Sequence, residues 1–419
     1  MSLLLQNKDK IFYGWVIVAA SLIIVTTLLG IRSSFGMFFK SIQGEFDLTR
    51  AATSSIFSAY TVFSIAFAVI SGWALDRYGP RLVVCLMGLL AGLSLLATSQ
   101  TNSFWQLFLG YSLLLSMGTT GTIPVLTSVI SRWFQRSRGT ALGIAISGIG
   151  LGTLVVSPVS AYLISNLDWR MSYVVMGLVT WLVVIPLAML LRRYPGVLGV
   201  LPDGIKSGAA GAELTGSDEK SQLTGLSLQQ AFRTRSFWLI LSNWLFVGIC
   251  QTIILIHVVP YATDIGIPAI QASTILSVIG GSYIISVLSV GRISDRVDRK
   301  VLGVICTALG AVALIWLTRS QELWMLYLFA ITFGLAWGGI SVINVMLVSE
   351  AFGSLSLGVI MGTLEVGFLA GSAIGAALGG FIFDVTGSYF IAFSIGAAAM
   401  LTIAVFITFI RREVNMRVG

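Results

Sequence analysis

Charged residues are scarce in this chain of 419 residues: Asp, Glu, Lys and Arg make up only 10%, while 56% of the residues are hydrophobic and the mean hydropathy is +0.95. A soluble domain carries about 25% charged residues, so this chain cannot cover itself with an ordinary hydrated surface. The shortage of charge excludes a soluble enzyme, a nucleic-acid-binding protein and a disordered chain.

Histidine and cysteine are also nearly missing. His257 is the single histidine, so a histidine-based metal site or catalytic triad has almost no material. The three cysteines lie inside apolar runs without paired spacing, which predicts apolar packing rather than disulfides or metal binding: Cys85, Cys250 and Cys306. The chain has no Gly-Lys-Ser/Thr phosphate loop, which argues against ATP as the energy source. We therefore expect no enzyme activity, no metal and no cofactor.

Long apolar runs occupy most of the chain, and a bilayer-spanning helix needs roughly 20 apolar residues. The long polar segment 192–236 divides these runs into two groups of six, which predicts bundles at 1–191 and 237–419. Within that segment, Leu226–Arg235 is predicted to form a short amphipathic surface helix. The expected fold is an all-α polytopic membrane protein with twelve transmembrane helices in two pseudo-symmetric bundles, at 12–39, 51–75, 82–99, 104–131, 139–164, 172–191, 237–261, 270–290, 301–318, 323–349, 356–383 and 388–410.

The distribution of Lys and Arg predicts the orientation. With the N-terminus inside, 20 of the 25 basic residues fall in inner segments and four in outer loops, and Arg32 remains within a span. Cytoplasmic loops of membrane proteins carry such an excess of positive charge. Both termini are therefore predicted to be cytoplasmic. The net charge of +8 is then a signal of topology, and no nucleic-acid partner is expected.

The two halves repeat at an offset of 219 residues. The shift places Gly72 on Gly291 and the pair Asp76-Arg77 on Asp295-Arg296. Because glycine is abundant in this chain, the Asp-Arg pair carries the weight of the comparison. Two six-helix halves of like orientation suit a carrier in which the substrate lies between the halves and access alternates.

A charged motif ends the second predicted span, and a weaker copy ends the eighth. We expect its glycines to let a neighbouring helix approach closely and its aspartates to accept hydrogen bonds from a helix N-terminus. The arginines would pair with acids or lipid phosphates at the inner face. Contacts of this kind would close the inner mouth in one state and break in the other. The predicted gate residues are Gly72, Asp76, Arg77 and Arg81, with Gly291, Asp295 and Arg296 in the copy.

On these motifs, the chain resembles the major facilitator superfamily over essentially its whole length. The resemblance implies a twelve-helix secondary transporter that alternates access around a central cavity lined by helices 1, 4, 7 and 10. The chain looks most like the bacterial monocarboxylate and oxalate/formate-type branch. That resemblance depends on Tyr13-Gly14-Trp15, Arg132-Trp133-Phe134, Asp168-Trp169-Arg170, Phe237-Trp238, His257-Val258-Val259-Pro260-Tyr261 and Thr386-Gly387-Ser388-Tyr389.

Two positions depart from that branch. Monocarboxylate transporters usually carry a substrate-binding arginine in helix 8, four residues before the motif glycine, where this chain has Val287. Their helix 4 tyrosine, two residues before a proline, corresponds to Thr122 before Pro124. Both differences argue against a simple lactate-like substrate.

Charges inside the membrane point to the transport site, because a charge at mid-bilayer is costly unless it faces a cavity or a partner. Arg32 lies eight residues before Lys40, about 12 Å from the outer helix end at 1.5 Å per residue. A guanidinium at this depth can hold a carboxylate through two hydrogen bonds. The alternative is a structural arginine that reaches outward or bonds backbone carbonyls.

Glu365 is the one acid predicted near mid-membrane. A buried carboxyl group favours its neutral form and can therefore load and release a proton. Its alternatives are a structural hydrogen bond or a counter-ion role toward Arg32. His257, near the outer end of helix 7, is a second candidate for proton coupling or a structural element of an outer gate. Further candidates for substrate hydrogen bonds, each of which can instead satisfy a neighbouring backbone group, are Gln251, Tyr283, Trp337, Asn344 and Thr122.

The favoured hypothesis is a monomeric secondary carrier in a bacterial-type inner membrane that moves a small organic anion, a monocarboxylate, together with protons. In it, Arg32 binds the carboxylate and Glu365 or His257 takes the proton. The alternative is a proton-driven exporter of amphipathic drugs or metabolites, which a wide apolar cavity with one acid also fits. A non-transporting nutrient sensor is less favoured, because the predicted tails and the 192–236 loop hold no obvious domain.

Overall fold

The computed structural model describes residues 12–134, 137–195, 225–294, 296–353 and 356–411. The described chain is helical apart from one isolated bridge, between Gly225 and Gly353. It contains twelve helical stretches long and apolar enough to cross a membrane, which confirms the predicted number of spans. Helices suit this setting because their backbone polar groups are satisfied within each segment.

Six of the spans form the first half, α1 to α10. Three of them are divided into shorter helices, which distinguishes them from the continuous runs predicted above. In chain order the helices are α1 (Tyr13–Ser33) and α2 (Phe35–Glu45), α3 (Arg50–Tyr78), α4 (Pro80–Ser99), the group α5 (Phe104–Leu107), η1 (Phe108–Leu114), α6 (Leu115–Thr119) and α7 (Thr122–Trp133), then α8 (Arg138–Ile146) with α9 (Gly148–Leu167), and α10 (Trp169–Leu190).

The second half holds the remaining six spans, preceded by the short helix α11 (Leu228–Ala231). The predicted surface helix at Leu226–Arg235 is thus only four residues long, because Leu226 instead donates its backbone N–H to the carbonyl of Phe352, at 2.8 Å. The spans are α12 (Arg235–Asp264), α13 (Ala269–Ile293), α14 (Arg299–Leu317), α15 (Leu323–Phe352), α16 (Leu357–Thr386) and α17 (Phe390–Phe409).

Two breaks in the helices have clear local causes. The first span is interrupted between α1 and α2 at Ser34, whose hydroxyl donates to the carbonyl of Ile31 at 2.8 Å. The fourth span contains the π-helical turn η1 and then a left-handed residue, Gly121, with a φ of 86°. Both features interrupt the regular helix near the middle of a candidate span. Single π-helical turns inside α-helices are frequently found at functional sites.

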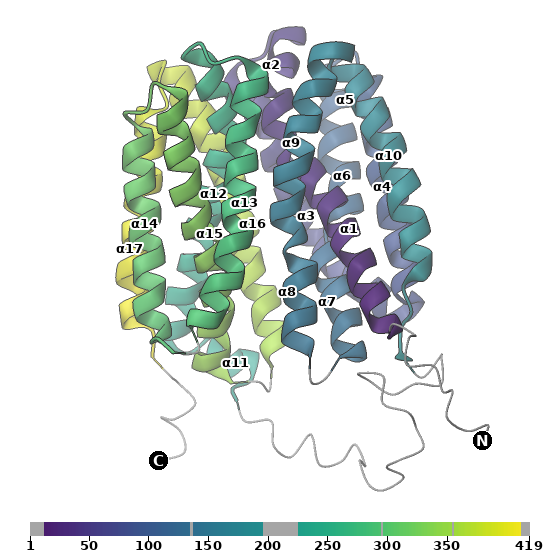
Figure 1. Cartoon of the computed structure of the whole chain (residues 1–419), viewed down its shortest axis with the longest axis vertical. Coiled ribbons are helices and arrows are strands. Elements are labelled where there is room, and N and C mark those ends of the chain that lie inside the picture. Colours follow the sequence, from purple (N-terminus) through teal and green to yellow (C-terminus); the bar gives the residue numbers. More distant parts are fainter. Residues whose placement is uncertain (1–11, 135–136, 196–224, 295, 354–355, 412–419) are drawn as a thin grey trace, which may run out of the picture.

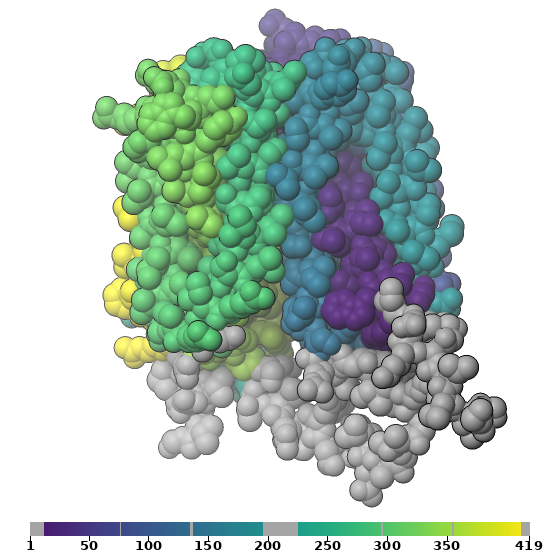
Figure 2. Space-filling view, viewed as in Figure 1, coloured from purple at the N-terminus to yellow at the C-terminus, as the bar shows by residue number. Residues whose placement is uncertain are grey.

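The two halves lie side by side, with α1 to α10 on one side and α12 to α17 on the other (Figure 1). They meet along two seams: α3 packs against α16, and α9 packs against α13. The α9–α13 seam is visible in Figure 2 as the line where blue and green side chains meet. Close approach there requires glycine, because a Cβ on Gly280 would lie 2.5 Å from the carbonyl oxygen of Gly150.

The ends of the bundle differ in how tightly the halves meet. We call the end where α1 begins and α17 finishes the near end, and the end where α2 is followed by α3 the far end. At the far end a Cβ on Gly36 of α2 would lie 2.6 Å from the carbonyl oxygen of Leu255 in α12. At the near end, several helix glycines have open space beside them, with no described neighbour within 4 Å of an added Cβ: Gly72, Gly139, Gly143, Gly291, Gly358 and Gly362.

The α9–α13 seam gives a first prediction, with a matched control on the adjacent residue. Gly280→Ala places a methyl group against the Gly150 backbone, and overpacking of this kind costs about 1–3 kcal/mol. Gly281→Ala adds the same methyl group where the nearest described atom is 3.9 Å away. We expect a lower Tm in detergent for G280A only. Equal Tm values for the two variants would show that the seam is not tightly packed.

Candidate functional site

One basic and one acidic side chain, from different halves, interact electrostatically at mid-span. Arg32 lies in the last turn of α1, next to the break at Ser34, and Glu365 lies in the third turn of α16. Both are half-buried, and the two charges are close enough to interact electrostatically. Neither side chain forms a hydrogen bond or a close ion pair with another residue that the structure describes. The pair therefore leaves both charged groups able to take a further partner.

Aromatic rings surround the guanidinium of Arg32. Its Cζ lies 6.0 Å from the ring centroid of Phe57 and 5.9 Å from that of Tyr60, both on α3. These separations are at the outer limit of cation–π attraction, so the rings hold the guanidinium loosely. The π-helical turn η1 adds Tyr111, which is buried and whose hydroxyl has no hydrogen-bond partner among the described residues. The surroundings of Arg32 are thus apolar rings with one free hydroxyl.

The polar candidates of the second half pair with one another. The rings of Tyr283 on α13 and Trp337 on α15 are 4.6 Å apart between centroids. Asn243 on α12 donates from Nδ2 to the Oδ1 of Asn344 on α15, at 3.1 Å. Gln251 is buried on α12. The structure brings these residues from three different helices into one half, and their contact with a substrate stays a prediction.

Thr122 is placed differently from the other candidates. It is buried at the start of α7, directly after the left-handed Gly121, and its hydroxyl donates to the carbonyl of Thr119 at 2.6 Å. The hydrogen bond of Thr122 therefore joins the start of α7 to the end of α6, across the break at Gly121. In this conformation Thr122 satisfies a backbone group, which is the alternative left open from the sequence.

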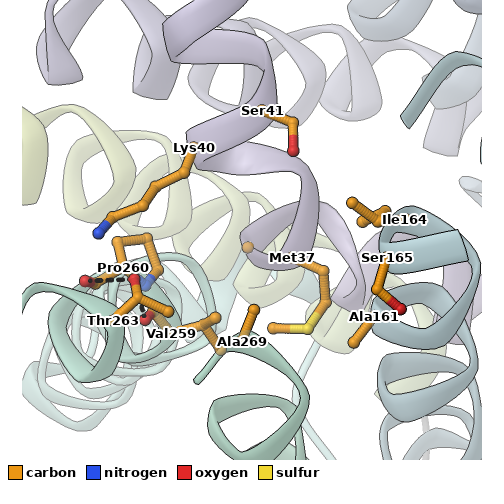
Figure 3. Close-up of a pocket in the computed structure, with 11 residues that line it drawn as sticks. Met37, Lys40, Ser41, Ala161, Ile164, Ser165, Val259, Pro260, Thr263 and Ala269 are labelled. Carbon is orange, nitrogen blue, oxygen red and sulfur yellow. Dashed lines mark hydrogen bonds between the residues drawn. The ribbon is translucent and has the colours of Figure 1, made fainter. Parts of the chain in front are cut away.

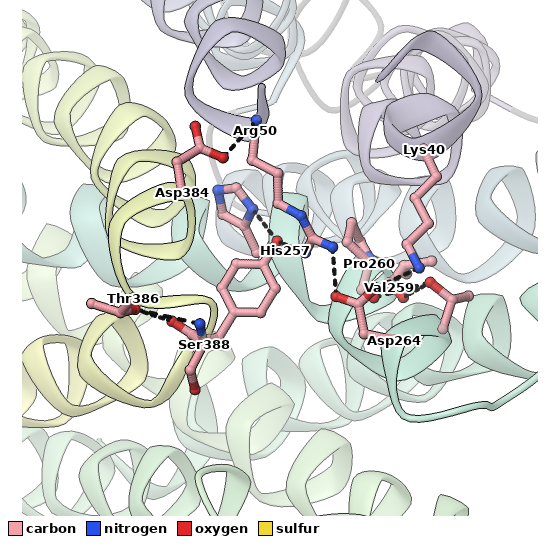
Figure 4. Close-up of polar contacts among 11 residues, drawn as sticks. Lys40, Arg50, His257, Val259, Pro260, Asp264, Asp384, Thr386 and Ser388 are labelled. Carbon is pink, nitrogen blue, oxygen red and sulfur yellow. Dashed lines mark hydrogen bonds and ion pairs between the residues drawn. The ribbon is translucent and has the colours of Figure 1, made fainter. Parts of the chain in front are cut away.

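An ionic network closes the far end across the α3–α16 seam (Figure 4). The carboxylate of Asp384 accepts the backbone N–H groups of Arg50 and Ala51, at 2.9 and 2.7 Å, and so caps the N-terminus of α3 from the other half. An anion at a helix N-terminus is favoured by the unpaired N–H groups and by the helix dipole. The Arg50 guanidinium also lies 2.7 Å from Asp264 and donates to the Tyr389 hydroxyl at 2.6 Å.

Lys40 extends this network to α2, because its Nζ lies 2.6 Å from the second carboxylate oxygen of Asp264. One acid on α12 thus holds two basic residues of the first half. The guanidinium of Arg50 also lies over the Phe383 ring, at 3.5 Å from its centroid, and is buried. A buried cation–π contact of this kind is stronger than an exposed one, because water does not compete for the guanidinium.

His257 is fully buried on α12 beside this network. Its Nε2 lies 3.2 Å from the carbonyl of Ala376, and its Nδ1 lies 3.3 Å from the hydroxyl of Tyr389. Since a carbonyl only accepts hydrogen bonds, the hydrogen of the neutral ring sits on Nε2, and Nδ1 accepts from Tyr389. Donation therefore runs from Arg50 through Tyr389 and His257 to Ala376. Both ring nitrogens thus have partners at the far end, and the two roles predicted for His257, in an outer gate or in proton coupling, stay predictions.

The glycines of the predicted gate at the near end have open space beside them. No described neighbour approaches Gly72 or Gly291, so the expected close packing of a helix on these glycines is absent here. Arg81 donates from Nε to the carbonyl of Leu191 at 2.7 Å, which ties α4 to the end of α10 within one half. Arg77 lies between two rings of its own segment and, like Arg296, is exposed.

Two of the predicted gate residues, Asp295 and the side chain of Asp76, lie outside the described residues. Glu350, near the end of α15, lies 3.8 Å from Arg299 at the start of α14.

Sequence reasoning missed the far-end network. The distribution of charge indicated only that Lys40 and Arg50 belong to outer loops, and no prediction involved Asp264 or Asp384. A usable signal was present: two aspartates, Asp264 and Asp384, end long apolar runs at the same predicted side where Arg50 begins one. Acids at the ends of spans can bind the N-terminus of a helix from the other half. Such a charge pattern indicates where the two halves meet.

The fold and this site define a membrane transporter: twelve candidate spans in two groups, closed at one end and carrying a charge pair between them. The chain belongs to the Major Facilitator Superfamily, whose family description matches residues 21–363. It is therefore a secondary transporter and not an enzyme.

Among known relatives the chain is similar to monocarboxylate transporters. It is 26% identical to monocarboxylate transporter 13 of Rattus norvegicus over 391 residues, which cover 93% of this chain and 87% of the relative. It is 24% identical to human monocarboxylate transporter 2 over 391 residues, which cover 90% and 81% of the two chains. The relationship to these transporters is distant.

A solved structure shares the fold. A bacterial homologue of the human lysosomal transporter Spinster, in an inward-facing and unoccupied conformation, superposes with a TM-score of 0.70 at 16% identity and covers 98% of this chain and 97% of its own. The occupied form of that homologue gives a TM-score of 0.68 at 14% identity. The predicted fold class is confirmed.

Asp384 gives a second prediction. Asp384→Asn removes the negative charge at the start of α3 and leaves one acceptor oxygen for two backbone N–H groups. A charge at a helix N-terminus contributes about 0.3–1 kcal/mol. Asp168→Asn is the matched control, because Asp168 caps α10 by accepting from Met171 within the first half only, at 2.9 Å. Spin labels at exposed far-end positions 102 and 321, in a cysteine-free background, report the distance between the halves. We expect D384N alone to increase the population with the long distance, and an unchanged distribution would contradict the gate.

Proposed function

We propose that the chain transports a small organic anion, a monocarboxylate, together with a proton across a bacterial-type inner membrane. Access would alternate between the far end, which is closed here, and the near end, which would face the cytoplasm. The observation that carries the proposal is the Arg32–Glu365 arrangement, with one charge from each half and neither held by another described side chain.

Arg32 suits an anion with a single carboxylate. Among the described residues it is the one basic side chain at mid-span, since the others lie at helix ends or, like Lys40, in the far-end network. A planar guanidinium can donate two parallel hydrogen bonds to one carboxylate. A dicarboxylate would leave its second charge among the rings of Phe57 and Tyr60, where no cation is at hand.

Charge balance assigns the proton to Glu365. With no substrate, the carboxylate of Glu365 and the guanidinium of Arg32 offset each other. A bound substrate anion would place two negative charges near one positive charge in a half-buried site, where like charges repel strongly. Protonation of Glu365 removes the excess. Substrate and proton would then bind and leave together, which is symport.

The names of the relatives support the substrate class. The similar proteins are called monocarboxylate transporters. In the expected family pattern an arginine stands in the eighth span, where this chain has the half-buried Val287. We propose that Arg32 supplies the positive charge instead, from the opposite half. The far-end gate of Arg50, Asp264 and Asp384 would then isolate the substrate from the other side of the membrane.

Arg32 gives a third prediction. Arg32→Gln removes the charge, and breaking a buried charge pair with a ligand costs about 2–5 kcal/mol. We expect uptake of a radiolabelled monocarboxylate into proteoliposomes, driven by an inward pH gradient, to lose about 30-fold or more in kcat/KM. Arg32→Lys keeps the charge but loses the bidentate geometry, so it should raise KM more than it lowers kcat. Wild-type uptake by R32Q would refute this role.

Glu365 gives a fourth prediction, which separates binding from coupling. Glu365→Gln mimics the protonated acid permanently. We expect it to keep exchange of internal for external substrate and to lose accumulation against a gradient when only the pH difference drives transport. Glu322→Gln is the control, since Glu322 is an exposed acid at the far end. Accumulation by E365Q at the wild-type level would remove Glu365 from the coupling mechanism.

A further inference from the structure

The two seams between the halves differ at the far end, although they are equivalent under the internal repeat. The offset of 219 residues places Arg50 on Ala269 and Ser165 on Asp384. On the α3–α16 seam, Asp384 accepts the backbone N–H of Arg50, whose guanidinium contacts Asp264 of α12. The α9–α13 seam has alanine and serine at the equivalent positions and, in their place, a cavity of about 150 Å³.

This far-end pocket is built by both halves (Figure 3). Met37 and Lys40 of α2 and Ala161 of α9 come from the first half, while Pro260 of α12 and Ala269 at the start of α13 come from the second. The lining is mostly apolar. Its volume equals that of an engineered apolar cavity, about 150 Å³, that takes up benzene. The pocket therefore matches a ring-sized apolar body.

Lys40 is the one charged residue in the lining. Its ammonium group has three N–H donors, and its contact with Asp264, at 2.6 Å, engages only part of this capacity. The side chain is 40% exposed, so its position at the pocket edge leaves room for a second anionic partner. An apolar cavity of this size beside a lysine is complementary to a small ring that bears a single carboxylate.

We propose that the far-end pocket is a binding site for small aromatic monocarboxylates and that its occupation holds the far end closed. The ring would lie between α9 and α12, and the carboxylate would contact Lys40. Because the lining comes from both halves, the pocket exists only while the halves meet at the far end. A ligand that binds one conformation better than the other shifts the population toward it. Occupation would thus slow transport without contact with Arg32.

Benzoate tests the site by calorimetry on the full-length protein. Arg32→Gln is used as the background, because it removes the proposed substrate site and leaves the pocket intact. Ala161→Phe and Ala269→Phe fill the pocket from opposite halves, and the second change starts from an exposed residue that tolerates a larger side chain. Ile270→Phe is the control, since Ile270 is exposed and adjacent but does not line the pocket.

We expect R32Q and R32Q/I270F to bind benzoate with the same affinity, and both pocket-filling variants to bind it at least tenfold more weakly. Benzamide, which keeps the ring but not the charge, should also bind at least tenfold more weakly than benzoate. Unchanged affinity in R32Q/A269F would overturn the proposal. Complete loss of benzoate binding in R32Q would assign all binding to the Arg32 site, which overturns the pocket and leaves the proposed function standing.

The conformational part has its own readout. With spin labels at positions 102 and 321, saturating benzoate should deplete the long-distance population in R32Q and leave R32Q/A269F unchanged. A shift toward longer distances in R32Q, or an equal response in both proteins, would overturn the claim that the pocket locks the far end. Neither result bears on substrate binding by Arg32, because both proteins lack that arginine.

Discussion

A charge inside a membrane must be matched, and this constraint organises the structure. Arg32 and Glu365 lie at mid-span in opposite halves, and their side chains interact electrostatically. Neither is held by another described side chain, and in the proposed function an incoming anion and a proton would rearrange the pair. The break at Ser34, directly after the last turn of α1, and the rings of Phe57 and Tyr60 provide the local surroundings of this charge.

The same constraint governs the closure of the far end. Asp384 satisfies backbone N–H groups that the start of α3 leaves unpaired, and Asp264 neutralises both Arg50 and Lys40. These contacts form only across a seam, so opening the far end must expose their charges to water rather than to lipid. The equivalent seam is closed by glycines in its middle and leaves a cavity at its end. Opening therefore requires breaking the contacts that Asp264 makes with Lys40 and Arg50 and that Asp384 makes with the start of α3.

The sequence predicted the spans well and the partners of the charged groups poorly, for physical reasons. Apolar run length and the distribution of charge determine how many helices cross a membrane, so twelve spans could be counted directly. Arg32 and Glu365 stood out because isolated charges in apolar runs are conspicuous. Partners such as Arg50 and Asp384 are separated by 334 residues, and no local pattern reveals which helix ends meet. The breaks at Ser34 and Gly121 depend on hydrogen bonds that only the folded chain makes.

The central claim is that one proton, carried by Glu365, accompanies each monocarboxylate bound to Arg32. The most direct measurement is uptake into proteoliposomes whose membrane potential is set by potassium and valinomycin at a fixed pH gradient. Symport of one anion with one proton moves no net charge, so the account predicts the same initial rate at every potential. A rate that rises when the interior is made positive would show that the anion crosses without its proton and would contradict the account.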